Sequence, residues 1–358
     1  MRVIHWHWDL PCCCQQPGVL HRQNRYQTII EIQGSVYLPG SMPMNENMYS
    51  AQRVISEVEK AVVGKRDVLT KIMTAILAGG HILIEDIPGT GKTTMALAFS
   101  RTMGLKVKRV QFTPDVLPAD LTGFTLYQKE TGKFVYQPGA AICNLLLADE
   151  INRTSPKTQS ALLEVMEEQQ VTVDGVTHRT GEPFIVIATE NPAGSAGTQL
   201  LPESQLDRFM ICVSMGYPTV EEEMEILKRD QKKGRISEET EPVLDAAQLL
   251  AMRSEVSGIF VHKRIYRYIA ELAKATRENE WTELGLSPRG TVALTAMAKA
   301  CAWMKGREYV IPADVQEVFP CVAGHRIFLN MKARVGHIRV DELIRQALEN
   351  VPAPALRG

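Results

Sequence analysis

The stretch 85-EDIPGTGKTT-94 contains the residues best suited to bind a phosphorylated ligand. A phosphate-binding loop has the pattern Gly, four residues, then Gly-Lys-Thr or Gly-Lys-Ser, and Asp86 stands where the first Gly belongs. That leading position requires an unusual backbone angle rather than a contact, and Asp tolerates left-handed conformations better than most residues. We therefore interpret the stretch as a nucleotide site rather than a glycine-rich turn without a ligand.

The chemistry of this loop depends on backbone N–H groups that face the β-phosphate at the start of a helix. Gly89 and Gly91 are the positions where the backbone must come closest to the ligand. Lys92 is expected to reach the β- and γ-phosphates, and the Thr93 hydroxyl can ligate Mg²⁺. The residues expected to bind nucleotide here are Pro88, Gly89, Thr90, Gly91, Lys92, Thr93 and Thr94.

Hydrolysis also requires an acid that holds the metal and a base for the attacking water, and 144-NLLLADEINR-153 supplies both. Asp149 and Glu150 follow a buried apolar strand at its carboxyl end, where open sheets bind their ligands. We expect Asp149 to hold Mg²⁺ and Glu150 to polarise the water. Two carboxylates after a strand can also form a helix cap.

The next strand, in FIVIATENP, ends at Asn191. An amide there can orient water between Glu150 and the γ-phosphate. Asn before Pro is otherwise a simple turn signal. Its place one strand after Asp149 and Glu150 favours the functional interpretation.

Two arginines are further candidates. Arg208, in LPESQLDRFM, is either a surface residue paired with Asp207 or an arginine finger that acts on the nucleotide of a neighbouring subunit. Arg289, in LSPRG, follows Ser287 as N-cap and Pro288 at the first helical position. Arg289 could bind the γ-phosphate and report its loss to the helical domain, or it could belong to nothing more than a well-capped helix.

Short apolar runs alternate with helical patterns from residue 81 onwards. The runs are HILIE, VKRVQF, NLLLADE, FIVIATE and FMICVSM. Unbroken apolar strands are typical of a parallel sheet that is covered on both faces, so we predict an α/β fold. Two polar hairpins interrupt it, with tips at Thr131-Gly132 and Asp174-Gly175.

Beyond Gly216-Tyr217-Pro218 no strand pattern remains, and residues 219 to 350 have helical patterns. We therefore predict an α/β core over residues 48–216 and a helical domain over residues 217–358. Residues 1–47 lack a sustained period, and we interpret them as a disordered tail or as sequence upstream of a true start at Met44 or Met48. A metal site built from His5, His7 and the nearby cysteines is the less favoured alternative, because the paired ligand spacing is missing.

The totals agree with a two-domain globular protein. The chain has 358 residues, 45% of them hydrophobic and 23% charged, and a net charge of −1. That charge argues against a protein that mainly coats nucleic acid. No apolar run is long enough to cross a bilayer, the opening residues lack the apolar core of a signal peptide, and Cys12, Cys13 and Cys14 do not suit a disulfide framework. We expect a cytoplasmic protein.

Taken in this order, the motifs resemble those of the AAA+ ATPases, specifically the MoxR family, over roughly residues 48 to 350. The closest correspondences are 109-RVQFTPDVLPADLTG-123, 144-NLLLADEINRTSPKTQSALLEVMEE-168, QVTVDGV, ATENP and LPESQLDRF. The phosphate loop of that family often lacks the leading Gly. The resemblance places Walker A on Gly89, Gly91, Lys92 and Thr93, Walker B on Asp149 and Glu150, sensor 1 on Asn191, the arginine finger on Arg208 and sensor 2 on Arg289. It places the adenine near Val62, Val63 and Gly64.

What the resemblance implies is an AAA+ core with an all-α lid, working as a ring, usually a hexamer, with ATP and Mg²⁺ bound between subunits. Relatives of this kind act as chaperone-like ATPases that assemble or activate protein clients, insert metals or cofactors, and often work with a partner that carries a von Willebrand factor A domain. Glu190 stands where relatives tend to have Gln, and the loop from Asn191 to Leu201 departs slightly from the family's usual acidic sequence.

Three other functions remain open from the residues. A nucleic-acid motor shares this core, although the hairpins carry few uncompensated basic residues for a DNA track. A metal-chelatase motor subunit has similar motifs. A nucleotide-gated scaffold that hydrolyses slowly is the third alternative, against which Glu150 and Arg208 argue.

Overall fold

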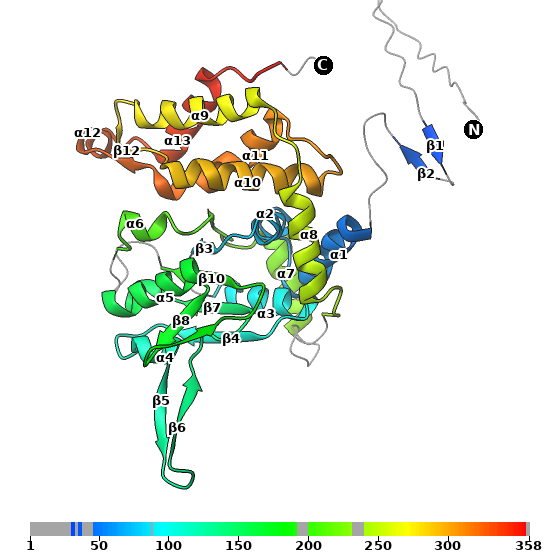
Figure 1. Ribbon diagram of the computed structural model, residues 1–358. Helices are drawn as coiled ribbons and strands as arrows, with labels where there is room; N and C mark the ends of the chain where they lie inside the picture. Colours follow the sequence, from blue (N-terminus) through cyan, green and yellow to red (C-terminus); the bar gives the residue numbers. More distant parts are fainter. Residues whose placement is uncertain are drawn as a thin grey trace, which may run out of the picture.

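The computed structural model describes residues 30–32, 35–37, 46–86, 89–191, 200–230 and 240–355. Its α/β part lies below a helical part in Figure 1. Most of the predicted tail over residues 1–47 lies outside the described residues, as do Met44, His5, His7 and Cys12 to Cys14. Within that stretch, β1 (Ile30–Ile32) and β2 (Ser35–Tyr37) pair antiparallel, and α1 begins at Glu46.

A five-stranded parallel sheet forms the core of the α/β part. Its spatial order is β11-β3-β10-β7-β4. The strands are β3 (Ile82–Glu85), β4 (Val107–Gln111), β7 (Leu145–Asp149), β10 (Ile185–Glu190) and β11 (Ile211–Val213). Each of the five apolar runs found in the sequence contains one of these strands, so the predicted parallel sheet is confirmed.

Helices cover both faces of this sheet, because alternate side chains of each strand point to opposite sides. Leu145 and Leu147 of β7 join one buried cluster, whereas Leu146 and Ala148 join the other. The first face packs on α1 (Glu46–Ala61), α2 (Arg66–Leu77) and α3 (Lys92–Thr102). The second packs on α4 (Pro118–Thr122), α5 (Pro156–Glu168) and the short elements η1 (Ile151–Arg153) and α6 (Glu203–Leu206).

Both predicted hairpins are present. The longer one, β5 (Gly123–Gln128) with β6 (Lys133–Pro138), extends away from the body in Figure 1. The shorter one is β8 (Gln170–Val173) with β9 (Val176–Arg179). At its tip Asp174 and Gly175 both have positive φ, 49° and 78°, as a two-residue hairpin turn requires. The rings of Tyr136 on β6 and His178 on β9 stack with centroids 3.7 Å apart, so the two hairpins touch.

After β11 the chain is mostly helical, as predicted. The helices are α7 (Val220–Asp230), α8 (Ala246–Ser257), α9 (Lys263–Arg277), α10 (Pro288–Met304), α11 (Pro312–Ala323), η3 (Gly324–Arg326), α12 (Met331–Val335) and α13 (Val340–Asn350). The expectation that no strand follows residue 218 is wrong. Two short strands, β12 (Thr282–Leu284) and β13 (Phe328–Leu329), pair antiparallel. Two and three residues are too few to show a periodic pattern in the sequence.

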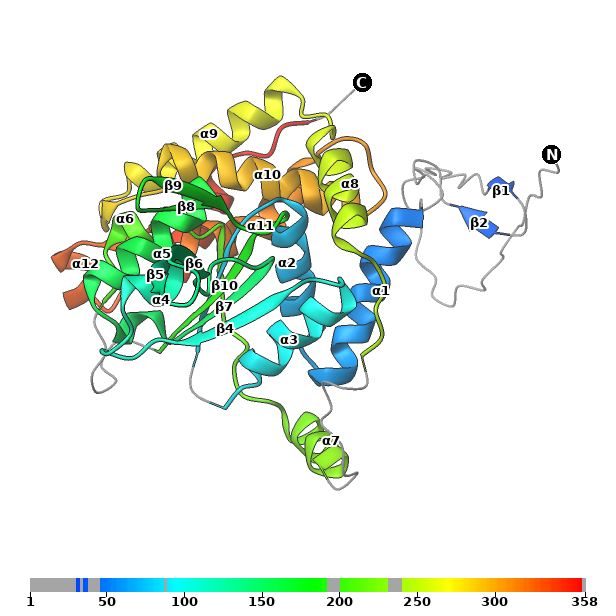
Figure 2. The same cartoon turned by 60° about the horizontal axis from the view of Figure 1, so that its bottom comes forward.

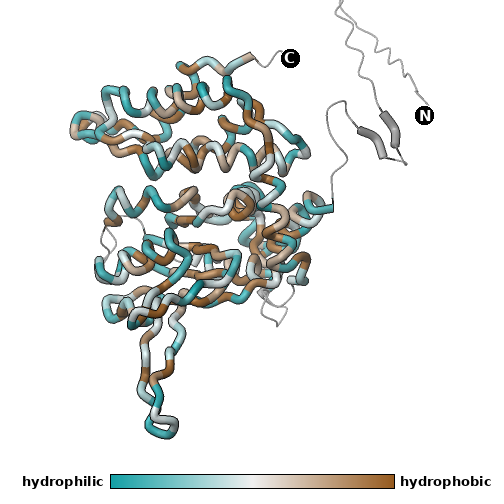
Figure 3. Tube along the Cα trace, viewed as in Figure 1, coloured by the Kyte–Doolittle hydropathy of each residue, from teal (hydrophilic) through white to brown (hydrophobic). Residues whose placement is uncertain are grey.

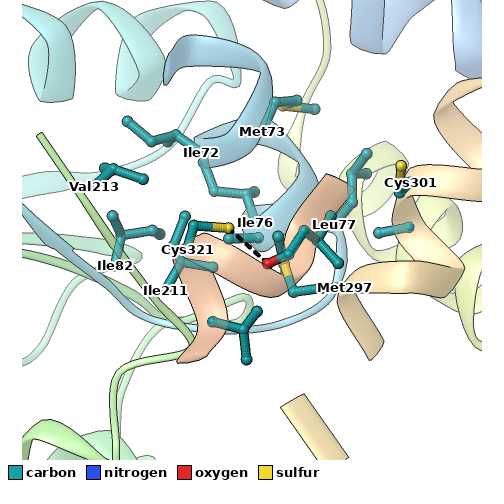
Figure 4. Close-up of a cluster of buried hydrophobic side chains, with 14 of the residues drawn as sticks. Ile72, Met73, Ile76, Leu77, Ile82, Ile211, Val213, Met297, Cys301 and Cys321 are labelled. Carbon is teal, nitrogen blue, oxygen red and sulfur yellow. Dashed lines mark hydrogen bonds between the residues drawn. The ribbon is translucent and has the colours of Figure 1, made fainter. Parts of the chain in front are cut away.

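The apolar cores of the sheet and of the helical part are continuous. Leu77 of α2 and Ile82 of β3 lie in one cluster with Met297 of α10 and Cys321 of α11, as Figure 4 shows. Burial raises the pKa of the Cys321 thiol to about 12, so this cysteine is a neutral packing residue. Figure 3 shows hydrophobic residues along the strands of the sheet and along the helices that pack on it. Among the described helices, none is both long enough and apolar enough to cross a membrane.

Candidate active site

The predicted phosphate loop leads directly from β3 into α3. Gly91 is the N-cap of α3, with φ of 86°, and Gly89 has φ of 87°. Both values lie in the left-handed region that glycine adopts readily, and open space surrounds the position of a Cβ at each. Pro88 lies outside the described residues. The loop therefore has the backbone geometry of an anion site at a helix start.

Lys92 occupies the first turn of α3 and is buried, with an exposed fraction of 8%. Its Nζ donates a hydrogen bond of 2.9 Å to the carbonyl oxygen of Asp86. Burial lowers the pKa of Lys92, while the carboxylates of Asp86, Asp149 and Glu150 oppose that shift. The ammonium group is thus held close to the two acids that the sequence predicts as its partners.

Asp86 has a different role from the one expected. It is absent from the described non-glycine residues with positive φ, so the expected left-handed backbone is wrong. Its side chain is instead the important part. Asp86 is buried, and its Oδ2 accepts hydrogen bonds from the backbone N–H groups of Met215 and Gly216, at 2.8 and 2.9 Å. The residue that breaks the loop pattern ties the phosphate loop to the segment that follows β11.

The predicted adenine segment forms the turn between α1 and α2. Gly64 has φ of 72°, and a Cβ there would collide with Glu222 of α7. Lys65 donates a hydrogen bond of 3.0 Å to the carbonyl oxygen of Tyr217. Val62, Val63 and Gly64 are therefore packed beside the start of α7.

Asp149 ends β7 and is buried. Its Oδ1 accepts a hydrogen bond of 2.6 Å from the Thr189 hydroxyl of β10, and its Oδ2 forms an ion pair of 2.8 Å with Arg109 of β4. Thr189 in turn accepts from the backbone N–H of Glu150 at 2.8 Å. Three neighbouring strands thus hold the carboxylate in one orientation.

Glu150 has a left-handed backbone, with φ of 58°. Its Oε1 accepts a hydrogen bond of 3.0 Å from the Asn191 side chain, and its Oε2 accepts from Gln111 at 2.8 Å and Arg153 at 2.9 Å. Burial acts to raise the pKa of Glu150, but the hydrogen bonds from Asn191 and Arg153 outweigh it and lower the pKa below the ordinary value. The carboxylate is therefore charged at neutral pH, as a group that polarises water must be.

Asn191 is also fixed through its backbone. Its carbonyl oxygen accepts a hydrogen bond of 3.0 Å from the side chain of Asn152, which is buried just after β7. The structure thus brings Lys92, Asp149, Glu150 and Asn191 together at the carboxyl ends of β3, β7 and β10. We call these four residues the carboxyl-edge cluster.

Glu190 lies next to this cluster and opposite Glu85 in the register of β10 and β3. Burial, followed by the charge of Glu85, raises the pKa of Glu190 from 4.5 to about 7. This acid therefore holds its proton up to about neutral pH.

The two candidate arginines lie elsewhere. Arg208 precedes β11, at the amino edge of the parallel sheet. It donates to the carbonyl oxygen of Leu163 at 2.8 Å and forms an ion pair of 2.7 Å with Glu167 near the end of α5. Arg289 in the first turn of α10 binds the other oxygen of the same Glu167, at 2.5 Å. We call Arg208 and Arg289 the arginine pair. Both arginines therefore lie at the amino edge, away from the carboxyl-edge cluster.

Asp207 is not the partner of Arg208, contrary to one interpretation of the sequence. Its carboxylate accepts hydrogen bonds from the Ser287 hydroxyl at 2.8 and 2.9 Å and from Nε of Arg326 at 2.7 Å. Arg326 is 3% exposed and also donates to the carbonyl oxygens of Phe209 and Met210. Asp207, Ser287 and Arg326 form a latch that joins the segment before β11 to the helical part. Ser287 caps α10 as predicted, accepting from the Gly290 N–H at 2.9 Å.

Several residues of the site were missed from the sequence. Thr189, Gln111 and Arg109 are ordinary strand residues, and only the strand order places them beside Asp149 and Glu150. Arg326 follows a helix without a recognisable motif. Arg153 was the exception, because its spacing of three residues from Glu150 could have indicated the ion pair.

The donor set fits a nucleotide with Mg²⁺ better than a tightly bound transition metal. No group of three or more His, Cys, Asp or Glu residues with metal-binding geometry occurs in the described part of the chain. Mg²⁺ usually takes one or two protein oxygens together with phosphates and water. Thr93 in the first turn of α3 and Asp149 at the end of β7 carry oxygen atoms of this kind.

Comparisons with known proteins agree with this geometry. Residues 81–211 match the ATPase family associated with various cellular activities (AAA), and residues 274–347 match the AAA lid domain. The chain is 44% identical to YeaC of Bacillus subtilis over 306 residues, 86% of this chain and 95% of that protein. It is 36% identical to the chaperone MoxR1 of Mycobacterium tuberculosis over 328 residues, 89% of this chain and 86% of the relative.

The fold comparison gives the same result. A crystal structure of a protein from Cytophaga hutchinsonii described as an ATPase superposes with a TM-score of 0.81 at 36% identity, covering 86% of this chain and 96% of that one. Both matched regions contain the predicted functional residues, with the phosphate loop and Glu150 in the first and Arg289 in the second. The chain belongs to the MoxR family of AAA+ ATPases.

Proposed function

We propose that this protein is a Mg²⁺-dependent ATP hydrolase whose active sites are each completed by two copies of the chain in a ring. One observation supports this most strongly. The carboxyl-edge cluster holds the groups for binding ATP and polarising water, while the arginine pair lies at the amino edge of the same sheet. A head-to-tail contact between copies brings these two edges together, and such contacts close into rings when the rotation permits.

Within one copy, each residue of the cluster has a distinct task. The backbone of Gly89 and Gly91 and the ammonium of Lys92 bind the phosphates of ATP, with Val63, Gly64, Thr90 and Thr94 lining the rest of the site. Thr93 and Asp149 hold Mg²⁺, which supplies charge neutralisation at the phosphates when bound. Glu150 polarises the water, and Asn191 orients Glu150 through its hydrogen bond of 3.0 Å.

The neighbouring copy supplies the remaining positive charge. We propose that Arg208 and Arg289 both leave Glu167 and bind the phosphates held by the next subunit. Both arginines are partly exposed, at 31% and 47%, and their ion pairs with Glu167 are of the kind that contribute little, about 0–1 kcal/mol. Such weak pairs can be exchanged for the stronger contact with phosphate.

The latch connects this exchange to the lid. Asp207 is adjacent to Arg208 in the chain and is bound by Ser287 and Arg326 of the helical part. A displacement of Arg208 therefore pulls on the first turn of α10, where Arg289 lies. We infer that hydrolysis moves the lid relative to the sheet, and that this movement remodels a protein client.

The hairpin β5–β6 is our proposed client contact. Phe124, Leu126, Tyr127 and Phe134 expose half or more of their surface there. Exposed aromatic residues are typical of surfaces that bind other proteins. The hexameric ring, the cytoplasmic location, the partner with a von Willebrand factor A domain and the insertion of metals or cofactors stay expectations drawn from the family.

ATP turnover and nucleotide binding test the assignment together. We expect Glu150→Gln to bind ATP like the wild type but to lose turnover, because the amide does not act as a base. Lys92→Ala should lose binding, since Lys92 contacts the ground-state phosphates. Equal turnover by the wild type and Glu150→Gln would show that this cluster is not the working site.

A further inference from the structure

A cavity of about 700 Å³ lies between the end of α2 and helices α8, α9 and α10. Its wall is largely apolar, with Val256, Ile269 and Val292 among the lining residues. It is open to solvent, because Val292 exposes 70% of its surface. Pro288, next to Arg289, lies at its rim. The cavity is therefore on the amino edge of the sheet, beside the arginine pair.

The charges around this cavity have one sign. Arg253, Arg277 and Lys299 line it, and no acidic side chain occurs among the described residues of its wall. Arg277 and Lys299 each donate to a backbone carbonyl. Nε of Arg253 donates to the carbonyl oxygen of Ile76 at 2.8 Å, but its buried Nη2 has no hydrogen-bond partner among the described residues. A buried donor without an acceptor is costly, and an anionic group in the cavity relieves that cost.

Helix α7 has the complementary composition and projects away from the body of the molecule in Figure 2. Val220, Met224 and Leu227 are 70%, 52% and 62% exposed, and their spacing of four and three residues puts them on one face of the helix. Glu223 belongs to the same face and is exposed. This face of α7 therefore has apolar residues around one carboxylate. Such a face is complementary to an apolar groove that carries cations.

The position of α7 also fits. It follows the carboxyl end of β11, beside Gly64 and the proposed adenine segment. In the ring proposed above, the carboxyl edge of one copy faces the amino edge of the next. The exposed apolar face of α7 and the cationic cavity then lie on opposite sides of the same boundary.

We propose that α7 of one copy docks into this cavity of the neighbouring copy, with Val220, Met224 and Leu227 against the apolar wall and Glu223 toward its cations. This inference rests on the proposed ring and goes beyond it by assigning a second contact at each boundary. The contact would join the carboxyl edge of one copy, where we propose that ATP binds, to the helical part of the next copy.

Sedimentation velocity with ATP, over a range of protein concentrations, tests the contact. Leu227→Asp places a charge against the apolar wall, and we expect it to raise the concentration needed for assembly at least tenfold. Val335→Asp is the matched control, because Val335 on α12 is 76% exposed, compared with 62% for Leu227, and lies outside both surfaces. It should assemble like the wild type.

A charge exchange provides the second arm. Glu223→Lys and Lys299→Glu should each weaken assembly, and the double variant should recover much of the loss if the two side chains face each other. Normal assembly of Leu227→Asp overturns the proposal. So does native mass spectrometry that finds a small amphipathic anion bound to the wild type and absent from Val292→Glu, with assembly unchanged in both.

Different results would rule out the α7 contact alone and the ring together with that contact. If Leu227→Asp assembles normally and turnover still depends on Arg208, the ring stands and only the α7 contact is wrong. If the wild type stays monomeric with ATP and turns over without Arg208, both the ring and the contact are wrong.

Discussion

The two edges of the central sheet hold their charged groups in different ways. At the carboxyl edge, Asp149 and Glu150 each accept several hydrogen bonds of 2.6 to 3.0 Å from neighbouring strands and loops. At the amino edge, Arg208 and Arg289 share one partly exposed carboxylate, Glu167. The hydrogen bonds hold the two acids in fixed orientations, whereas the two arginines can exchange their partly exposed ion pairs for other partners. In the ring that we propose, a site divided in this way is incomplete in one copy, so that assembly can control turnover.

The largest expected effect comes from removing the exchangeable group. We expect Arg208→Ala to lower ATP turnover on the order of 10³-fold, as is typical for an arginine finger, while nucleotide binding by the isolated copy is retained. Mixing Arg208→Ala with Lys92→Ala should restore part of the turnover, because some boundaries then combine an intact Lys92 with an intact Arg208. The absence of any recovery in the mixture would contradict a site shared between copies.

The next effect concerns the acid beside the carboxyl-edge cluster. Between pH 4.5 and about 7 the folded chain keeps the proton on Glu190 that the unfolded chain releases, so the stability falls as the pH rises across this window. Glu190→Gln removes this titration and should raise the free energy of unfolding at pH 8 by about 3 kcal/mol, with no gain below pH 4.5. Urea unfolding at several pH values measures it. Glu283→Gln, at an exposed position on β12, is the control, and an equal gain there would reject the explanation.

A smaller effect is expected at the latch. Ser287→Ala removes the cap of α10 and a hydrogen bond to Asp207, and we expect a loss of about 1 kcal/mol in the free energy of unfolding. Ser155→Ala removes the cap of α5 and should cost a similar amount. The Ser155 hydroxyl bonds to Thr158 of the same helix rather than to the lid. Only Ser287→Ala should also reduce turnover. Equal turnover by the two variants would show that the latch does not affect the function of Arg208.

The smallest effect is expected from the shared carboxylate. Glu167→Gln weakens the hold on Arg208 and Arg289 and should increase ATP turnover about twofold to fivefold, as expected when an ion pair worth less than about 1 kcal/mol is lost. Glu164→Gln, one turn earlier on α5, is the control. A decrease in turnover would show that Glu167 positions the arginines rather than restrains them.

The sequence was most informative where one short segment carries the whole signal. Lys92, Asp149 and Asn191 each follow an apolar strand, and the parallel sheet brings such residues to one edge, so their proximity was predictable. Arg289 was recognisable through its cap, but its partner was not, because Glu167 lies 122 positions away and on another element. The loop pattern concerns only the backbone of Asp86, whereas the contacts of its side chain depend on the folding of residues 215 and 216 against it. Contacts between distant side chains need the tertiary structure.

The carboxylate of Asp86 connects the phosphate loop to the linker that leads to α7. The backbone N–H groups of Met215 and Gly216, at the beginning of the linker to α7, both donate to Oδ2 of Asp86, the first residue of the phosphate loop. Loop and linker therefore behave as one stiff unit, and neither shifts alone without abandoning two charge-assisted bonds at once. We therefore expect a movement of the loop around bound phosphates to displace this linker, and α7 with it. The residue that departs from the loop pattern would then link the phosphate loop mechanically to α7.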